Sequence, residues 1–257
     1  MRFPLVVAIG GLSLALLAAT QATQSFKYQV HDMTRPQPAK VDPGAVGAPV
    51  PAPSDAIVLF GPAKPDLSAW RSGDGDAKWK VRDGMFAVEP STGDISTRDQ
   101  FGDVQLHLEW LVPVEAKVEG QHGGNSGVFF MDRYELQVLS SNPNVTYADG
   151  MAGALYGQYP PLVNACRPQG QWNVYDVVFR APVFKDGKLA KPATVTAFLN
   201  GVLVQDNAEL LGATAHGARA SYSPHDPTGP IRLQDHGDPI RFRNIWVRKL
   251  APRGGAE

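Results

Sequence analysis

Residues 79–88 read WKVRDGMFAV, in which two short apolar-alternating runs flank a central Asp-Gly turn. A two-residue turn of this kind joins antiparallel strands, and here it would pair Val81 with Phe86 and Trp79 with Val88. The four apolar side chains then share one face, because side chains alternate along a strand. The stretch predicts a β-hairpin with one face turned toward a core.

Similar patterns recur along the chain. An Asn-Gly turn at residues 200–201 predicts a hairpin that pairs Leu199 with Val202 and Ala197 with Val204. Further strands are predicted by apolar alternation over residues 104–112, 134–138 and 172–180. No helical periodicity is visible between residues 55 and 250, and no fixed-period repeat suggests a propeller. The pattern predicts an all-β sandwich or barrel.

The charge balance narrows the class of partner. The 257 residues include 24 basic and 25 acidic side chains, for a formal net charge of -1. This balance argues against nucleic acid or an anionic membrane as the main partner and favours a neutral polar substrate. The single cysteine, Cys166, cannot form an internal disulfide. We expect it to be a loop or half-buried residue, with a catalytic thiol as the alternative.

The two ends of the chain differ from its middle. Residues 1–22 combine Arg2, an apolar run and small residues, which predicts a signal peptide and a periplasmic or secreted protein without a membrane segment after cleavage. A permanent anchor helix is the alternative. Residues 23–54 contain six prolines and predict a poorly ordered linker. A folded domain at residues 55–250 and a tail at 251–257 complete the expected organisation.

Residues 229–247 read GPIRLQDHGDPIRFRNIWV and hold too many polar side chains for an ordinary buried hairpin. The turn signal at residues 237–239 predicts a strand pair that carries a site. Within it, Ile231, Leu233, Phe242 and Trp246 are expected to anchor the pair in the core, and Gln234, His236 and Arg243 to face a groove.

Polar residues on other strands are candidate partners for this pair. Alternation places Glu109, Glu135 and Gln137 on outward-facing positions, where ordinary solvated side chains are the alternative interpretation. With His236 they would supply a base, a proton shuttle and hydrogen-bond donors. The glycine-rich stretch 123–130 lacks the features of a phosphate loop, but Asn125 within it could orient a sugar hydroxyl.

Several longer strings occur in a fixed order between residues 57 and 247: WKVRDG at 79, DVQLHLEW at 103, GNSGV at 124, YELQV at 134, GALYG at 153, QWN at 171, LNG at 199, LQDHG at 233 and FRNIW at 242. Together they resemble the 3-keto-disaccharide hydrolase family, also described as 3-keto-glucoside lyase/hydratase domains. The resemblance implies a concanavalin A-like jelly-roll sandwich of two antiparallel sheets. It also implies an exported bacterial enzyme that acts on an oxidised sugar or glycoside.

The resemblance implies a definite reaction as well. A ketone at sugar carbon 3 acidifies the hydrogen on carbon 2, so a base can remove this hydrogen and the substituent on carbon 1 can leave. Water then adds to the enone, and the net result is hydrolysis. Such a site needs a base, a group that stabilises the enolate and an acid for the leaving group. A divalent metal ion that polarises the ketone is the one cofactor expected.

Carried over position by position, the resemblance assigns Glu135 as the base or a metal ligand and His236 as an acid/base or a metal ligand. Glu109 would be a second carboxylate. The expected substrate-binding residues are Asn125, Gln137, Gln234, Asp235 and Arg243. Ser140 and Ser141 stand where the family often carries an aspartate, which puts a metal ligand or an orienting group in question.

Two other functions are alternatives. A carbohydrate-binding module can share this fold, but it should show an aromatic platform with few titratable groups. A classical glycoside hydrolase needs two carboxylates that flank the scissile bond, a pair that Glu109 and Glu135 could imitate.

Overall fold

The computed structural model describes residues 26–122 and 124–251. The expected signal peptide, Gly123 and all but the first residue of the expected tail lie outside this range. Within it, the secondary structure is β apart from one 3-10 turn, η1 (Ala148–Gly150), and no helix is long and apolar enough to cross a membrane. The all-β prediction is confirmed.

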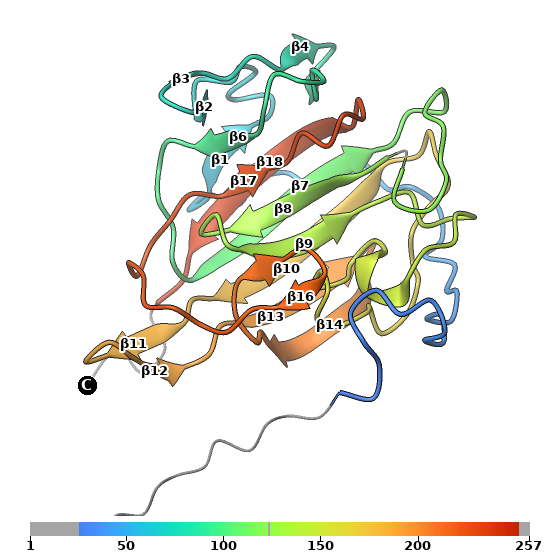
Figure 1. Ribbon diagram of the computed structural model, residues 1–257. Coiled ribbons are helices and arrows are strands. Elements are labelled where there is room, and N and C mark those ends of the chain that lie inside the picture. The colour runs from blue at the N-terminus through green and yellow to red at the C-terminus, as the bar shows by residue number, and fades with distance from the viewer. Residues whose placement is uncertain (1–25, 123, 252–257) are drawn as a thin grey trace, which may run out of the picture.

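Two antiparallel sheets form the sandwich (Figure 1). The larger has the order β14-β13-β10-β7-β18-β5-β4, with β1 also paired to β18. Its strands are β1 (Ile57–Phe60), β4 (Lys80–Arg82), β5 (Met85–Ala87), β7 (Val104–Leu111), β10 (Asn173–Arg180), β13 (Thr194–Leu199), β14 (Val202–Glu209) and β18 (Arg241–Lys249).

The smaller sheet has six strands in the order β3-β2-β6-β17-β8-β9. These are β2 (Trp70–Ser72), β3 (Gly75–Asp76), β6 (Ile95–Thr97), β8 (Ser126–Phe130), β9 (Tyr134–Val138) and β17 (Arg232–Leu233). Two separate ribbons are formed by β11 (Val183–Lys185) with β12 (Lys188–Lys191) and by β15 (Thr214–Ala215) with β16 (Ala218–Arg219).

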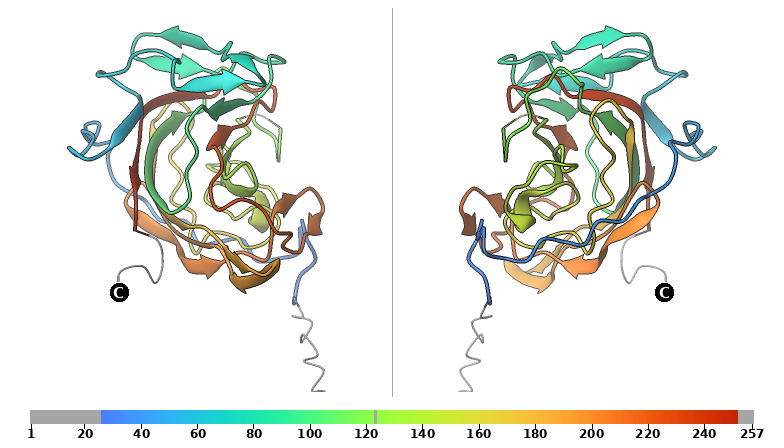
Figure 2. Two further views of the ribbon diagram at one scale, coloured as in Figure 1. Left: turned by 90° about the vertical axis from the view of Figure 1, so that its left-hand side faces the viewer. Right: turned by 90° about the vertical axis from the view of Figure 1, so that its right-hand side faces the viewer.

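The core lies between the two sheets, which curve around it in the end-on views of Figure 2. Leu106, Leu108 and Trp110 of β7 meet Leu136 and Val138 of β9 in one buried apolar cluster. The residues between them in the sequence therefore point to the two outer faces of the sandwich. This is the concanavalin A-like jelly-roll sandwich that the resemblance implied.

The two predicted hairpins form, with local differences. Val81 pairs with Phe86 as predicted, but Val81 lies on the edge strand β4 and is 44% exposed, whereas Phe86 is fully buried. Leu199 pairs with Val202 as predicted. An irregularity in the ladder then shifts the register, so that Ala197 faces Gln205 rather than Val204.

The prediction of a strand pair over residues 229–247 is wrong. β17 pairs with β6 and β8 in the smaller sheet, whereas β18 pairs with β1, β5 and β7 in the larger one. The Gly-Asp-Pro stretch is therefore a crossover between sheets. Ile231, Leu233 and Phe242 do belong to the core, but Trp246 is buried on the outer face of the larger sheet, stacked on His107.

Residues 26–54, hereafter the N-terminal arm, are packed against the domain instead of forming a poorly ordered linker. Asn164 exchanges backbone hydrogen bonds with residues 39 and 41, and the Arg167 guanidinium donates to the carbonyls of Gly44 and Ala45. The Val50 carbonyl accepts a hydrogen bond from Asn244. Proline lacks a backbone donor but keeps its carbonyl, and the arm is held by backbone bonds to Asn164 together with side-chain donors of Arg167 and Asn244.

Cys166 is buried, and burial raises the pKa of its thiol to about 12. A thiol in this state is not a nucleophile near neutral pH, because the reactive form is the thiolate. The structure thus supports the expected non-catalytic role of this residue.

Candidate functional site

The candidate site lies on the outer face of the smaller sheet. Tyr134, Leu136 and Val138 of β9 point into the core, so Glu135 and Gln137 point away from it. A cavity of about 370 Å³, here the Glu135 cavity, opens over them. It is lined by Asn125, Phe129, Glu135, Gln137, Tyr156, Thr214, His216, Gln234 and His236.

Glu135 owes its position to a glycine on the neighbouring strand. β8 pairs with β9 so that Gly127 faces Gln137 and Phe129 faces Glu135. A Cβ atom on Gly127 would lie 2.4 Å from Oε1 of Glu135 and 2.8 Å from the Phe129 ring, closer than real contacts allow. The absence of a side chain at position 127 therefore lets the carboxyl group fold across the strand beneath it.

Glu135 is buried, with only 5% of the residue exposed. Burial raises its pKa to about 8, and the opposing effect of Arg232 is partly offset by Asp94. Arg232 is itself engaged, because it binds both Asp94 and Asp132 and stacks 3.6 Å from the centre of the Phe129 ring. A carboxyl group with this pKa is a stronger base than an ordinary glutamate.

Amide groups form one wall of the cavity. Gln137 donates through Nε2 to Oδ1 of Asn125 over 3.3 Å and to Oε1 of Gln121 over 3.2 Å. Its Oε1 atom is buried without a hydrogen-bond partner among the described residues. Buried polar atoms are normally paired, so this oxygen is suited to accept a bond from a ligand hydroxyl.

The residues that follow β17 take different roles. The backbone N–H of Gln234 donates to the Gly127 carbonyl over 3.1 Å, and Ser126 Oγ donates to the Gln234 carbonyl over 2.8 Å. Gln234 is thereby fixed beside β8, with exposed His236 at the cavity mouth. Asp235 does not line the cavity: its carboxylate accepts backbone hydrogen bonds from Gly93 and Gly237, so it shapes the loop.

The sequence prediction missed four lining residues: Phe129, Tyr156, Thr214 and His216. The Tyr156 hydroxyl lies 2.8 Å from the Tyr147 hydroxyl and 3.3 Å from Nδ1 of His216. Tyr156 belongs to the GALYG string, which was a usable signal, and Phe129 is an outward position of β8 by alternation. Thr214 and His216 lie on the short ribbon around β15, where no periodicity marks them.

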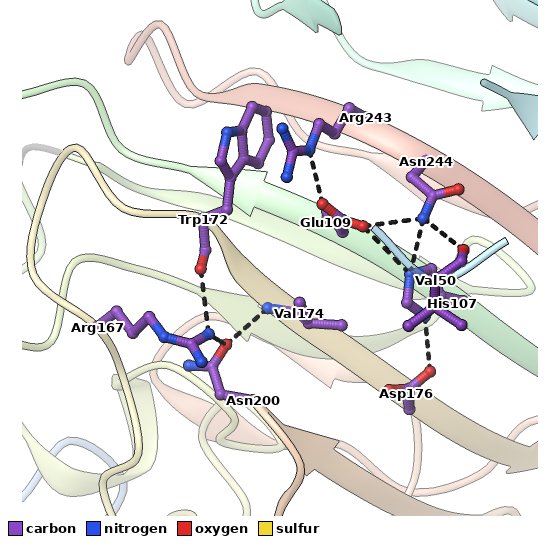
Figure 3. A network of polar contacts seen from close by, with 10 residues as sticks. All are labelled: Val50, His107, Glu109, Arg167, Trp172, Val174, Asp176, Asn200, Arg243 and Asn244. Atoms are coloured by element: carbon purple, nitrogen blue, oxygen red, sulfur yellow. Dashed lines mark hydrogen bonds and ion pairs between the residues drawn. The ribbon is translucent and has the colours of Figure 1, made fainter. Parts of the chain in front are cut away.

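Glu109 and Arg243 are not part of this cavity. Glu109 points outward from β7 of the larger sheet, where Nε of Arg243 donates to its Oε2 over 2.6 Å (Figure 3). Since both carboxylates point away from the shared core, the whole sandwich separates Glu109 from Glu135. A glycosidase pair needs roughly 5 to 9.5 Å between carboxyl groups, so these two residues cannot flank one bond.

Glu109 instead belongs to a buried His107 network (Figure 3). Nδ1 of His107 lies 2.7 Å from Asp176, and Nε2 lies 3.6 Å from Glu109. Asn244 donates to both Glu109 and the Val50 carbonyl. Burial alone would lower the pKa of His107, but the bonds to Asp176 and Glu109 prevail and raise it to about 9. Through Asn244, this buried charged network is hydrogen-bonded to the N-terminal arm at Val50.

A divalent metal is not supported by the donor set. Glu135 and His236 both line the cavity, yet no group of three or more His, Cys, Asp or Glu side chains converges among the described residues. Ser140 and Ser141 are engaged in the fold, since the Ser141 hydroxyl accepts from the Ala152 N–H and the Ser140 carbonyl from Asn144. The described residues therefore do not fit a chelating site for a divalent metal.

Comparison with known proteins identifies the family to which the chain belongs. Residues 55–248 match the model of a family described as the 3-keto-alpha-glucoside-1,2-lyase-like domain. The chain belongs to this family, and the family indicates a carbohydrate-active, hydrolase-like function.

Individual relatives agree with this assignment. A 3-keto-disaccharide hydrolase from Bacteroides thetaiotaomicron is 24% identical over an alignment of 217 residues, and the match covers 71% of this chain and 71% of the relative. A crystal structure of a proposed glycosyl hydrolase from Parabacteroides distasonis is 48% identical, covers 77% of this chain and 85% of its own, and has a TM-score of 0.74. A second such structure from the same organism, 22% identical with a TM-score of 0.55, supports the fold.

Proposed function

We propose that this protein cleaves 3-keto-glycosides by abstracting the C2 proton, eliminating the C1 substituent and adding water to the product. The observation that carries the proposal is the buried Glu135 carboxyl group, whose pKa is raised to about 8 in a cavity where no other acidic side chain is among the described lining residues. A base of this strength suits a hydrogen that an adjacent ketone has already acidified.

In the first step Glu135 takes the proton from C2, and the electron pair of the C–H bond moves toward the ketone at C3. The enolate oxygen that develops needs hydrogen-bond donors nearby. Asn125, Gln234 and Tyr156 carry donor groups at the cavity wall. Gln137 is suited to orient a hydroxyl through its unpaired Oε1.

In the second step the C1–O bond breaks and the leaving oxygen takes a proton. His236 and the Tyr156–His216 pair are the available acids, since all three side chains line the cavity. Water then adds across C1 and C2: its hydroxyl joins C1, and Glu135, whose carboxyl proton has exchanged with solvent, returns a proton to C2. The atoms balance as a net hydrolysis without an oxidant or reductant.

The cavity lining also indicates the charge of the substrate. No Lys or Arg is among the described residues that line it, and Arg232 nearby is held by two aspartates. A substrate carboxylate would be desolvated there without a lysine or arginine to pair with it, which is costly. We therefore expect a neutral oxidised sugar rather than a uronate.

The decisive experiment compares a 3-keto-glucoside with its unoxidised parent glucoside. We expect turnover of the keto compound only, and loss of this turnover in Glu135→Gln, which keeps the shape and removes the base. Glu109→Gln serves as the matched control, because it alters a carboxylate on the opposite face and should lower stability while sparing the chemistry. Equal cleavage of both sugars would contradict elimination, and cleavage of neither would favour a binding module.

The place of action is a further part of this proposal. We expect export to the periplasm or the medium, on the basis of the N-terminal 22 residues. Fractionation of cells that express the full chain, with N-terminal sequencing of the product, checks it. A cytoplasmic product that retains Met1 would contradict it.

A further inference from the structure

One end of the Glu135 cavity is backed by a residue from outside the family domain. The family match begins at residue 55, yet His31 of the N-terminal arm stacks on Tyr147, with 3.9 Å between ring centres and 20° between planes. Its ring also meets Tyr156 edge-on at 5.1 Å and lies 5.4 Å from the His216 ring. Tyr156 and His216 line the cavity.

Contacts on both sides of His31 fix the arm at this point. The backbone N–H of His31 donates to Oδ2 of buried Asp149 over 3.2 Å, and Arg219 of β16 donates to the Tyr28 carbonyl over 3.1 Å. Figure 1 shows this first, blue part of the arm beside β16. His31 has a φ of +61°, an uncommon conformation for a non-glycine residue, which indicates that the surroundings hold it in place.

A chain of hydroxyl groups connects His31 to the cavity. Beneath its ring, the Tyr147 hydroxyl lies 2.8 Å from that of Tyr156, which lies 3.3 Å from Nδ1 of His216. Burial raises the pKa of Tyr156, and the charge of Glu135 contributes in the same direction. Tyr156 is therefore protonated at neutral pH and within electrostatic reach of Glu135.

We propose that the N-terminal arm is a working part of the site, in which His31 is a positioning residue that holds the Tyr147–Tyr156 pair so that the Tyr156 hydroxyl faces the substrate. For its effect on turnover the inference rests on the proposed function. His31 acts through ring stacking: Nε2 is buried without a hydrogen-bond partner among the described residues, so the ring's flat face is the useful feature.

This assignment separates positioning from simple attachment of the arm. His31→Phe keeps an aromatic plane and removes the unpartnered Nε2, so it should preserve the stacking. His31→Ala removes the plane. Gln37→Ala is the matched control within the arm, because among the described residues Gln37 Nε2 donates to the Thr146 carbonyl and has no hydrogen bond to either tyrosine hydroxyl.

The test measures kcat and KM on a 3-keto-glucoside for the full chain and these three variants. His31→Ala should lower kcat about 10- to 100-fold with a much smaller change in KM, as expected for a misplaced catalytic group. His31→Phe should restore kcat to within about threefold of wild type, and Gln37→Ala should match wild type. Wild-type kcat in His31→Ala, or equal losses in all three variants, would overturn the inference.

A second readout needs no substrate. Ultraviolet titration of tyrosine ionisation should show two of the seven tyrosines ionising at lower pH in His31→Ala, but not in His31→Phe, because loss of the covering ring hydrates the pair. If the wild type does not cleave the keto sugar, the proposed function is wrong. The tyrosine titration then tests by itself whether His31 holds the tyrosine pair. Identical titration curves for wild type and His31→Ala would overturn it.

Discussion

Oε1 of Glu135 lies 2.4 Å from the point where a side chain on Gly127 would begin. The two residues sit on neighbouring strands, β9 and β8, and the carboxyl group occupies the space that the glycine leaves open. The missing side chain of Gly127 on β8 thus allows the proposed base, Glu135 on β9, to occupy its position.

Gly127→Ala should therefore displace the Glu135 carboxyl group. The added methyl group would meet both Oε1 and the Phe129 ring, so we expect kcat to fall about 100-fold and stability to fall by about 1–3 kcal/mol. Kinetics on a 3-keto-glucoside and thermal unfolding measure the two effects. Gly47→Ala is the control, since nothing lies within 4 Å of its Cβ position. Full activity in Gly127→Ala would show that the carboxyl position is unimportant.

Glu135 should also set the pH dependence of turnover. Only the ionised carboxylate can accept the C2 proton, and a pKa of about 8 leaves roughly a tenth of it ionised at pH 7. We expect kcat/KM to rise about tenfold per pH unit below pH 8 and to level off above it. A profile that is flat between pH 5 and pH 8 would contradict this assignment.

The same group should make the fold less stable as the pH rises. The unfolded chain releases the Glu135 proton near the ordinary value of 4.5, whereas the folded chain keeps it until about 8. The folded state binds more protons between these values, so the free energy of unfolding falls across this window. Glu135→Gln should reduce this slope, as followed by denaturant unfolding at pH 5 and pH 8, and an unchanged slope would argue against a buried neutral carboxyl.

His107 should produce a second, separate loss at higher pH. Its pKa is raised from 6.5 to about 9, so its stabilisation is complete below pH 6.5 and is lost as the pH rises through 9. His107→Gln should be less stable than wild type at pH 6 and should depend less on pH between 7 and 10. If the free energy of unfolding changed equally with pH in the two proteins over that range, a charged His107 would be contradicted.

The N-terminal arm should contribute to stability. A chain that begins at residue 55 loses the arm contacts of Asn164, Arg167 and Asn244 and uncovers Trp246. We expect its unfolding temperature to lie about 5 °C or more below that of a chain beginning at residue 26. Equal unfolding temperatures would mean that the arm is only a tether.

Local chemistry was enough to predict part of this structure. Asp-Gly and Asn-Gly turns gave two hairpins, because two-residue turns set their own register at the first pair. Alternation correctly turned Glu135 and Gln137 outward. Composition alone suggested a loose linker for residues 23–54, since it does not reveal that buried side chains such as Arg167 bind the arm's carbonyls.

Alternation and turn signals did not predict which strands, distant in the sequence, pair with one another. Alternation showed that Glu109 points away from a core, but not that β7 and β9 belong to different sheets, and this difference removes Glu109 from the site. The turn signal at residues 237–239 looked like a hairpin, yet β17 finds its partners more than 100 residues earlier in the chain. Tyr156 and His216 reach the cavity through loops that carry no periodic signal.

The central claim, that Glu135 removes the C2 proton, is tested most directly by turnover of a 3-keto-glucoside in deuterium oxide. Elimination followed by hydration returns a solvent-exchanged proton to C2, so wild type should give a product deuterated at C2, well above a no-enzyme control. Glu135→Gln should give neither product nor label. Product formed by the wild type without deuterium at C2 would mean that the glycosidic bond breaks directly, and it would contradict the mechanism.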